Sequence, residues 1–429
     1  MSLSTLLQQQ ITQIHQGGRK VVARKLKRVL KISVKLPGYI LAIPVVLVMR
    51  LIRPLILVRW QGLDGSRIGH LASITEMYLC EHDAGINLPK QRHIDLFYSA
   101  YKPVCNLQLL KMWKRVLHVW PAWILTPVAL VNRHIPGGLV HNIGCNYGRD
   151  VRNLLDRFPK HLNFTVDEEA RGVFGLQSMN IPVETPFVCL IVRDSAYLEA
   201  FHPTNNWNYH NFRDSDIQNY VLASEELSRQ GYFVIRMGVH VHEAMKTTNP
   251  RIIDYSTNGM RTDFMDVYIG AKCDFCISTG TGWDEIPRIF RKPIVCVNLL
   301  PLVGLPAFTK EFIAITKHHV LEKGGKELTL REILSYGGDF GWYASDYKSK
   351  GIRLIENTPE EIRDVVIEMA ERLNGTWLSH EDDESLQQCF LEIFSTKAKK
   401  MTLRGQPLHG EIRGRFGAHW LRNNPQWLS

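Results

Sequence analysis

A chain of 429 residues is long enough for two ordinary domains. Hydrophobic residues make up 45% of it and charged residues 22%, a composition that excludes large-scale disorder. The formal net charge of +10 arises at one end, because no Asp or Glu precedes Asp64, whereas eleven Lys and Arg do. The remainder is nearly neutral, with 41 basic and 42 acidic residues. Nucleic-acid-binding proteins spread basic residues over a folded face, so this distribution argues against nucleic acid and indicates an anionic membrane surface.

The eight cysteines indicate a reducing, cytosolic compartment. Several lie inside apolar runs, as Cys189 does in FVCLIV and Cys296 in IVCVN, which is typical of reduced core residues. Cys273 and Cys276 form a CxxC, but no second cysteine pair accompanies it and the run CDFCIS predicts a strand. We therefore do not expect a zinc site.

Residues 1–59 form a basic, apolar leader that we expect to associate with a membrane. Across 19–35 basic residues recur at helical spacing, which gives one cationic face. Residues 36–49 carry no charge and would span roughly 21 Å as a helix, shorter than the roughly 30 Å hydrocarbon core. Extending this stretch to Val58 takes in two arginines, each costing about 2.5–3.5 kcal/mol at mid-membrane. An interfacial or shallow re-entrant anchor is favoured over a transmembrane helix or a buried helix pair.

The pattern after the leader predicts an α/β fold with two Rossmann-like domains. Strand LILVRW, Gly-containing loop QGLDGSRIG and helix HLASITEMYLCEH open an N-terminal domain at 60–175. The segment IPVETP is a linker, and alternating strand and helix signals then predict a second domain at 186–375. Residues 376–429 form a tail with an acidic patch and a basic segment, which can pack back on the first domain.

The most informative segment is DFCISTGTGWDEIPRIFRKPIVCVN. A buried strand ends at Ile277, and a turn of small residues follows at Ser278, Thr279, Gly280, Thr281 and Gly282. Small residues let backbone amides approach a phosphate, and in an open α/β sheet a strand end is where a ligand belongs. Asp284 and Glu285, where a helix begins, are candidates for ribose hydroxyls or for pairing with the helix dipole. The alternative is a tight turn followed by a helix cap.

Arginines follow other predicted strands in the second domain. Arg193 ends FVCLIVR, Arg213 and His210 close the loop after it, and Arg236 ends YFVIR. The planar guanidinium binds two oxygens at once and therefore suits a diphosphate; an Arg–Asp pair that fixes the loop is the alternative. The run 214–216, DSD, predicts a capped helix start and not a metal-binding motif, so no metal is expected.

His70 is the candidate catalytic base, because it lies where a Gly-rich loop leads into a helix and histidine titrates in the useful range. We expect it to face the donor from the N-terminal domain, across an interdomain cleft. A histidine that caps or packs that helix is the alternative. Arg67 is a candidate contact for the acceptor, such as a lipid phosphate. Asp194, next to Arg193, is the second catalytic candidate.

Six motifs together resemble a bacterial family of glycosyltransferases that occurs with capsule, exopolysaccharide or O-antigen synthesis. They are RIGHLA followed by EMYL, FVCLIVRD, HNFRDSDIQNY, GYFVIRMG, RTDFMDVYI and ISTGTGWDEIPRIFRKPIVCVN, across residues 60–375. The resemblance implies a GT-B-like architecture with the nucleotide-sugar in the second domain. It also implies that side chains, and not a metal, stabilise the leaving group.

The sequence and this resemblance together predict sugar transfer from a nucleotide-sugar to a glycan or polyprenyl-linked acceptor. They place the chain at the cytoplasmic face of a bacterial inner membrane. No cofactor is expected besides the donor substrate. Two alternatives are another polysaccharide-modifying transferase on the same fold and a non-catalytic membrane scaffold of a polysaccharide assembly complex.

Overall fold

The structure is a computed structural model that describes residues 21–23, 26–27, 33, 36–144, 148–201, 207–306, 309–403 and 405–429. By internal contacts it divides into two units. Of the described residues, unit 1 takes those in Met1–Leu63, Pro89–Ala100 and Leu117–Gly144, and unit 2 takes those in Asp64–Leu88, Tyr101–Val116 and Cys145–Ser429. The α/β class is confirmed, because each unit is built on a parallel sheet.

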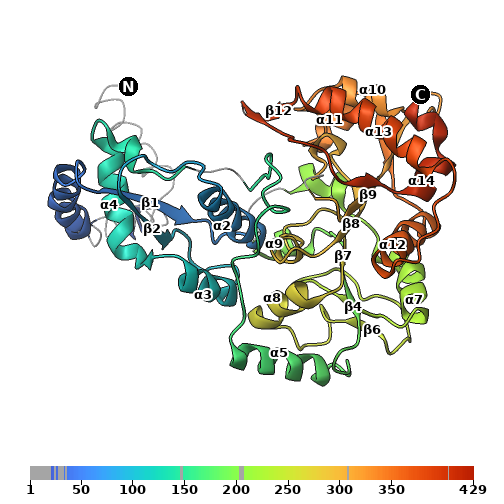
Figure 1. Cartoon of the computed structure of the whole chain (residues 1–429), viewed down its shortest axis with the longest axis horizontal. Coiled ribbons are helices and arrows are strands. Elements are labelled where there is room, and N and C mark those ends of the chain that lie inside the picture. The colour runs from blue at the N-terminus through green and yellow to red at the C-terminus, as the bar shows by residue number, and fades with distance from the viewer. Residues whose placement is uncertain are drawn as a thin grey trace. The chain divides into compact units, whose positions relative to one another are not determined.

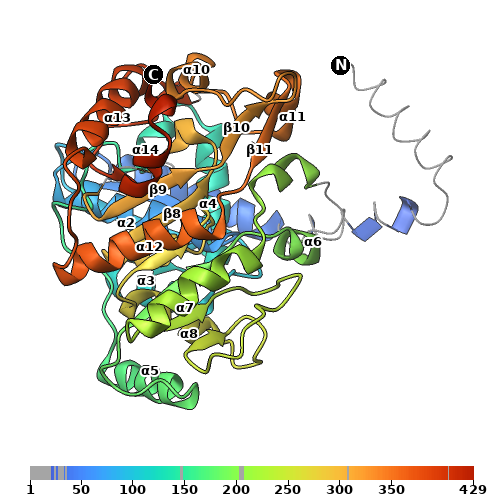
Figure 2. The ribbon, with the colours of Figure 1, turned by 90° about the vertical axis from the view of Figure 1, so that its right-hand side faces the viewer.

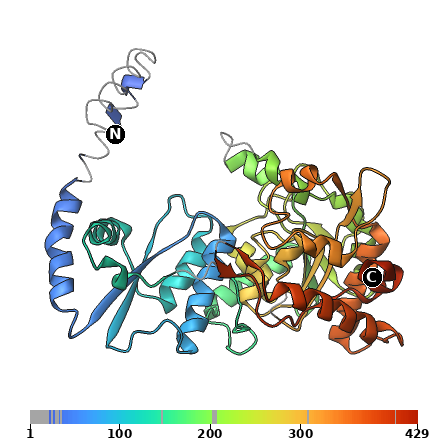
Figure 3. The ribbon, with the colours of Figure 1, turned by 90° about the horizontal axis from the view of Figure 1, so that it is seen from above.

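Unit 1 holds a three-stranded parallel sheet with the order β1-β2-β3 (Leu57–Leu63, His93–Ser99 and Val119–Trp120). A helix at residues 36–51, α4 (Ala122–His134) and the short η1 (Gly138–His141) complete it. Figure 3 shows helix 36–51 in blue beside α4 in teal. Ala42 and Val46 of that helix pack with Leu125 and Val128 of α4 and with the sheet, which forms the core of the unit.

A buried ion pair ties β1 to β2 in unit 1. The Arg59 guanidinium donates from Nε to Asp95 Oδ1 at 2.7 Å and from Nη2 to Asp95 Oδ2 at 2.5 Å. Both side chains are less than a tenth exposed, so removing either partner would leave an uncompensated buried charge.

Unit 2 is built on a seven-stranded parallel sheet with the order β14-β9-β8-β7-β4-β5-β6. In that order the strands are Arg415–Phe416, Phe312–Thr316, Ile294–Leu299, Cys276–Ser278, Phe187–Ile191, Phe233–Arg236 and Ile252–Asp254. The strands of the sheet centre are buried along their whole length, as expected when helices cover both faces. From β4 the chain proceeds to β5 and β6 on one side and later to β7, β8 and β9 on the other. The carboxyl ends of β4 and β7 therefore form a topological switch point.

Helices lie on both faces of this sheet (Figure 1). Figure 2 shows α7 (Val221–Arg229) and α12 (Pro359–Asn374) side by side. Helix α12 packs on β8 and β9, and α7 packs on β5 and β6. The remaining helices are α2 (Ile68–Asp83), α3 (Leu107–Val116), α5 (Val166–Ser178), α6 (Ala196–Phe201), α8 (Asp263–Lys272), α9 (Glu285–Ile289), α10 (Leu330–Ser335), α11 (Ala344–Ser349), α13 (Asp383–Ala398) and α14 (Ala418–Asn423). The short 3-10 helices are η2 (Asn208–Arg213), η3 (Ile217–Tyr220), η4 (Leu302–Gly304) and η5 (Pro425–Leu428). Two antiparallel strand pairs lie outside the main sheet. They are β10 (His318–Leu321) with β11 (Ile352–Ile355), and β12 (Thr402–Leu403) with β13 (Gln406–Pro407).

The two units divide the chain differently from the predicted domains 60–175 and 186–375. Helices α2 and α3, within the first predicted domain, belong to unit 2. The predicted tail also belongs to unit 2, since β14 pairs with β9 at the edge of its sheet. The tail further packs on the segment before α5, where the Arg413 guanidinium lies 3.2 Å from the Asp156 carboxylate.

The predicted leader is described only in part, because most of residues 1–35 lie outside the described residues. Helix 36–51 buries Ala42 and Val46 but leaves a row of leucines and valines exposed. Within the described part of the chain, no helix combines the length and apolar character that crossing a bilayer demands.

The backbone of helix α2 packs directly against the backbone of the turn 280–282, both within unit 2. A Cβ on Gly69 would meet the carbonyl oxygen of Gly282 at 2.7 Å and its Cα at 3.0 Å. Any other residue at Gly69 would therefore displace either the helix or the turn. The Trp113 indole holds the same helix by donating to the carbonyl of Leu71 at 2.9 Å.

We expect Gly69→Ala to lower the free energy of unfolding by about 1–3 kcal/mol, because the added methyl group overpacks against backbone that cannot rotate away. Urea denaturation measures the change. Gly175→Ala in α5 is the matched control: its Cβ would meet only the flexible end of Met265 at 2.5 Å, and the helix preference of Ala offsets the cost by about 1 kcal/mol. Equal effects of the two substitutions would contradict the proposed backbone contact.

A buried charged cluster fastens α2 to the segment before α5 and to the residues after α9. The Glu76 Oε1 atom lies 3.0 Å from His161 Nδ1 and accepts from Arg291 Nη2 at 2.7 Å. The second ring nitrogen of His161 lies 2.9 Å from Asp83 Oδ2. Burial alone would lower the pKa of His161, but hydrogen bonds, with those to the two carboxylates among them, outweigh burial and raise this pKa to about 10.

The raised pKa of His161 predicts a loss of stability at alkaline pH. An unfolded histidine has a pKa of about 6.5, so between about pH 6.5 and pH 10 the folded chain holds a proton that the unfolded chain has released. The free energy of unfolding should fall across that window. We expect the decline to be steeper in the wild type than in His161→Gln, measured by urea denaturation at several pH values. Parallel curves would show that His161 is not charged in the folded state.

Candidate functional site

The carboxyl ends of β4 and β7 meet at the switch point of unit 2 and are tied together by two hydrogen bonds. The backbone N–H of Arg193, just after β4, donates to Thr279 Oγ1 at 2.9 Å. The N–H of Thr279, just after β7, donates to the Ile191 carbonyl at 3.3 Å. In open α/β sheets ligands bind outside the strand ends at such a point. The predicted turn and the predicted Arg193 are therefore neighbours.

The turn after β7 divides into residues that shape it and residues that face solvent. The buried Ser278 hydroxyl donates to Asp284 Oδ2 at 2.6 Å and accepts from the Gly280 N–H at 3.0 Å. Gly280 has φ +72°, a conformation that L side chains rarely adopt. Gly280, Thr281 and Gly282 line a cavity, whereas Ser278 and Thr279 hold the turn from behind.

Two arginines from the region after β4 lie beside this turn. Arg213, the last residue of η2, donates from Nη2 to the carbonyl oxygen of Gly280. The Arg193 Nε atom lies 3.2 Å from Asp214 Oδ1. Burial and the nearby positive charge of Arg193 lower the pKa of Arg213 to about 10. The Nε atom of Arg213 is buried and has no hydrogen-bond partner among the described residues. Such an excess of buried positive charge favours an anionic ligand.

Lys317, which was not predicted from the sequence, belongs to the same cluster. Its ammonium group donates to the Asp214 carbonyl at 2.6 Å and lies 3.4 Å from Glu356 Oε1. Burial lowers the pKa of Lys317, and burial raises the pKa of the Asp214 carboxyl to about 6. The sequence did contain a pattern that could have indicated Lys317. It directly follows the apolar strand β9, and Arg193 likewise lies just after β4.

His210 lies in η2 near the arginines, and its imidazole is neutral at physiological pH. Burial, and then the positive charges of Arg193, Arg213 and Arg67, lower the pKa of His210 to about 4. The Arg67 guanidinium lies over the Trp207 ring, 5.9 Å from the ring centroid. The structure therefore brings Arg67, Arg193, His210 and Arg213 close enough to influence one another.

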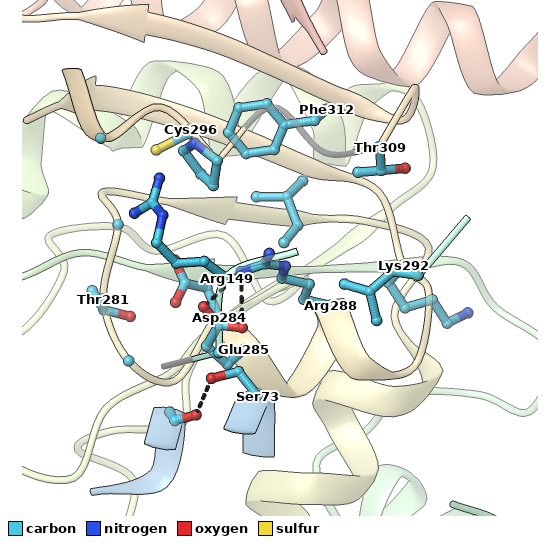
Figure 4. Close-up of a pocket in the computed structure, with 18 of the residues that line it drawn as sticks. Ser73, Arg149, Thr281, Asp284, Glu285, Arg288, Lys292, Cys296, Thr309 and Phe312 are labelled. Atoms are coloured by element: carbon cyan, nitrogen blue, oxygen red, sulfur yellow. Dashed lines mark hydrogen bonds and ion pairs between the residues drawn. The ribbon is translucent and has the colours of Figure 1, made fainter. Parts of the chain in front are cut away.

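The cavity of unit 2 has a volume of about 970 Å³ and a strongly basic lining. Four Asp or Glu residues line it, together with eight Lys or Arg: Arg149, Arg157, Arg213, Arg288, Arg291, Lys292, Lys310 and Arg413. Figure 4 shows Arg149, Asp284, Glu285 and Arg288 gathered at its centre, with Cys296 and Phe312 on another wall. Arg149 and Arg413 were not predicted as site residues, because neither lies at a predicted strand end of the second domain or in the small-residue turn.

Asp284 and Glu285 both line the cavity, but each already has a partner within the fold. Asp284 accepts from the Ser278 hydroxyl, and burial raises its pKa. Glu285 pairs with Arg288, whose Nη1 lies 2.9 Å from Glu285 Oε1. Because α9 has only five residues, a bound anion would interact mainly with the positive charges of the cavity.

His70 also lines the cavity, and it lies in unit 2 with the turn, not in a separate domain. Its Nδ1 atom is 2.8 Å from Asp64 Oδ2, and its side chain is about half exposed. Burial raises the pKa of Asp64, but hydrogen bonds from Ser66 and His70 lower it by more. A carboxylate at one imidazole nitrogen orients the ring and leaves the other nitrogen to take a proton. Asp64 was not selected from the sequence.

Arg236 and Asp194 lie away from the cavity lining. The fully buried Arg236 donates from Nη1 to the Glu243 carbonyl at 2.6 Å and to Asp254 Oδ2 at 2.9 Å. The Asp194 carboxylate accepts from the backbone N–H groups of Ala196 and His242, both at 3.0 Å. Arg236 ends β5, which adjoins β4 on the side opposite β7. Both side chains fix loops in this structure.

The run 214–216 begins a capped helix, as predicted. The Asp216 side chain is the cap, and it accepts from the Gln218 N–H at 2.8 Å at the start of η3. Elsewhere in the described residues, Glu76, Cys80 and His161 lie close enough to hold a metal ion. In this structure Arg291 donates to Glu76 and contacts Cys80 Sγ at 3.5 Å, so positive charge already occupies that group.

No protein-family model and no curated protein matches the sequence. Among solved structures, a glycosyl transferase family 9 protein from Veillonella parvula is 10% identical with a TM-score of 0.37, over 61% of this chain and 85% of that one. The E. coli ADP-heptose LPS heptosyltransferase II is 14% identical with a TM-score of 0.36, over 74% and 98%. The heptosyltransferase TibC, in complex with ADP-D-beta-D-heptose, is 11% identical with a TM-score of 0.32, over 74% and 77%.

Proposed function

We propose that the chain is a glycosyltransferase that moves a sugar from a nucleotide-sugar donor to a surface polysaccharide or its lipid-linked precursor. One observation carries the proposal: Arg213, the Gly280–Gly282 turn and the Asp64–His70 pair meet at the switch point of unit 2. Arg213, the turn and His70 all line one basic cavity. The motifs that resemble glycosyltransferases of surface-polysaccharide synthesis contribute the same residues.

The donor diphosphate would lie against the turn and the Arg213 guanidinium. When the bond between sugar and diphosphate breaks, negative charge grows on the leaving phosphate. Donors that are already in place stabilise that charge without reorganisation, and a guanidinium can bind two phosphate oxygens together. The lining holds eight cationic side chains and four acidic ones. We propose that this excess of positive charge takes the place of a divalent cation, so that the reaction is metal-independent.

His70 is the better placed of the two catalytic candidates. Its ring faces the cavity, and Asp64 orients it at Nδ1, so the remaining nitrogen can remove the proton of an acceptor hydroxyl. Both carboxylate oxygens of Asp194 accept backbone hydrogen bonds. We therefore propose His70 as the general base and assign Asp194 to positioning of the loop after β4. Arg67, exposed at the start of α2, remains the proposed acceptor contact.

The GT-B-like arrangement belongs to the proposal, with unit 2 as the nucleotide-sugar half. Its doubly wound parallel sheet suits a nucleotide. We further propose that unit 1 lies on the cytoplasmic face of a bacterial inner membrane. Helix 36–51 exposes Leu41 by 68%, Leu47 by 55% and Leu51 by 80%, and the leader before it is basic. An apolar helix face beside cationic residues is typical of interfacial binding to anionic lipid.

We expect Arg213→Ala to weaken nucleoside diphosphate binding by roughly ten- to hundredfold, since a hydrogen bond to a charged group contributes about 1.5–3 kcal/mol. A thermal-shift panel of nucleoside diphosphates and nucleotide-sugars, with and without Mg²⁺, first identifies the nucleotide that stabilises the wild type. Calorimetric titration then compares the variants with this nucleotide. Arg213→Lys, which keeps the charge but loses the planar fork, should lie in between.

Arg229→Ala is the matched control, because Arg229 lies on α7 with an exposed side chain and forms an ion pair with Glu226 of the same helix. It should bind as the wild type does. Unchanged affinity in folded Arg213→Ala would remove the donor-site assignment. If no nucleotide stabilises the folded wild type, the transferase proposal fails and the membrane scaffold becomes the better account. The mass of the product separates glycosyl transfer from transfer of another group.

We expect wild-type protein to float with vesicles of anionic lipid and to bind vesicles of neutral lipid more weakly, since each basic residue near an anionic surface contributes about 1 kcal/mol. Leu41→Glu combined with Leu51→Glu should reduce flotation by about tenfold or more, because each leucine then no longer buries apolar area worth about 1.5–3 kcal/mol. Leu378→Glu is the control, because Leu378 is a still more exposed leucine in unit 2. Equal flotation of all three proteins would refute the membrane assignment of helix 36–51.

A further inference from the structure

Four aromatic side chains gather beside the arginines of the switch point. Trp207 and Tyr209 stack with ring centroids 6.0 Å apart, and Tyr209 contacts His210 at 4.1 Å. Tyr343, which precedes α11, lies 5.9 Å from Tyr209 and stacks on His210 at 6.4 Å with an interplanar angle of 15°. We call these four residues the aromatic platform. No stacking role has been assigned to any of these four side chains above.

The platform is open to solvent on one side and anchored on the other. Tyr209 is 39% exposed and Tyr343 is 49% exposed, whereas Trp207 is buried. Phe212 of η2 contacts Tyr347 of α11 at 5.2 Å, which joins the two elements that carry the platform. Aromatic rings contribute large apolar areas and are usually covered, so two adjoining exposed rings on a fixed support are suited to stacking.

The platform adjoins the proposed diphosphate site. In a 3-10 helix the side chains at positions i and i+3 lie on the same side, so His210 and Arg213 point from one side of η2. The rise between them is roughly 6 Å, at about 2.0 Å per residue. Arg213 lines the cavity, as does Trp342, the neighbour of Tyr343 in the chain. The four platform residues do not themselves line the cavity, but they adjoin its lining through Trp342 and through Arg213, the arginine proposed to hold phosphate.

The chemistry of His210 favours an uncharged flat ligand over a second anion. Its pKa is lowered to about 4, first by burial and then by the neighbouring arginines, so the ring is neutral at pH 7. The Nδ1 atom of His210 is buried without a hydrogen-bond partner among the described residues. A neutral imidazole within an aromatic stack offers π-stacking together with one donor and one acceptor.

We infer that the aromatic platform stacks against the nucleobase of the donor. The inference rests on the proposed function, because it assigns the base of the nucleotide whose diphosphate lies at Arg213 and the turn. Base and diphosphate are separated by a single ribose, and the platform and Arg213 are correspondingly adjacent on η2. Every nucleobase has a flat π-face, so stacking of this kind needs no particular base.

The test compares a nucleoside diphosphate with inorganic pyrophosphate, which lacks the base. Titrations use the full-length chain and whichever of UDP, ADP, GDP and CDP stabilises the wild type most. Replacing Tyr209 and Tyr343 together by Ala should weaken binding of that nucleotide by roughly ten- to hundredfold, the usual range when a stacking side chain is removed. Affinity for pyrophosphate should not change. Tyr343→Phe, which keeps the ring, should bind as the wild type does.

Phe174→Ala is the matched control, since Phe174 is an aromatic residue on α5 that is 69% exposed. It should leave both affinities unchanged. If the folded double variant binds the nucleotide normally, the platform assignment is wrong while the donor site at Arg213 still stands. Loss of affinity for the nucleotide-sugar alone, with normal binding of the diphosphate, would assign the platform to the sugar and overturn the base assignment. If the folded wild type binds no nucleoside diphosphate, both the proposed function and this inference fail.

Discussion

The hydrogen bond from the Arg213 guanidinium to the Gly280 carbonyl is the constraint on which the candidate site depends. It joins η2, which follows β4, to the turn after β7, and so unites the two strand ends of the switch point. The positive φ of Gly280 turns its carbonyl towards Arg213. The aromatic platform and the wall of the cavity both follow from the position of η2. Without this bond, no side chain of η2 would be held against the turn after β7.

The charges at this site oppose stability in the absence of an anion. Burial and Arg193 lower the pKa of Arg213, and burial also lowers the pKa of Lys317. Each of these shifts means that the fold makes the charged form less favourable than it is in water. A bound anion would instead make the charged forms of these cations more favourable. Shifted pKa values of this kind are typical of functional sites.

Local sequence patterns were sufficient for the strands, the small-residue turn and Arg213, because a buried strand followed by small residues or by an arginine is readable without tertiary information. They were insufficient wherever strand order matters. Arg193 and Arg236 end similar strands, but β4 adjoins β7 and β5 does not, so only Arg193 lies at the turn. Arg149 and Arg413 enter the cavity through long-range packing of the tail on the segment before α5, which no periodicity reveals. The division into units was not predictable either. Helix α2 follows β1 of unit 1 in the chain, but it packs in unit 2 through its close contact at Gly69.

The packing of α2 changes how the proposed base relates to the proposed donor site. The sequence suggested a histidine that reaches the donor from a separate domain. In the structure, Gly69 brings the backbone of α2 against Gly282, and His70 follows directly on the helix. The proposed base and the turn therefore lie beside one close backbone contact within unit 2. The distance between His70 and the turn is set by the missing side chain at Gly69. On the proposed function, His70 can therefore be aligned for proton removal without the closing of a domain. The acceptor hydroxyl, and not the histidine, is then the group that has to be delivered.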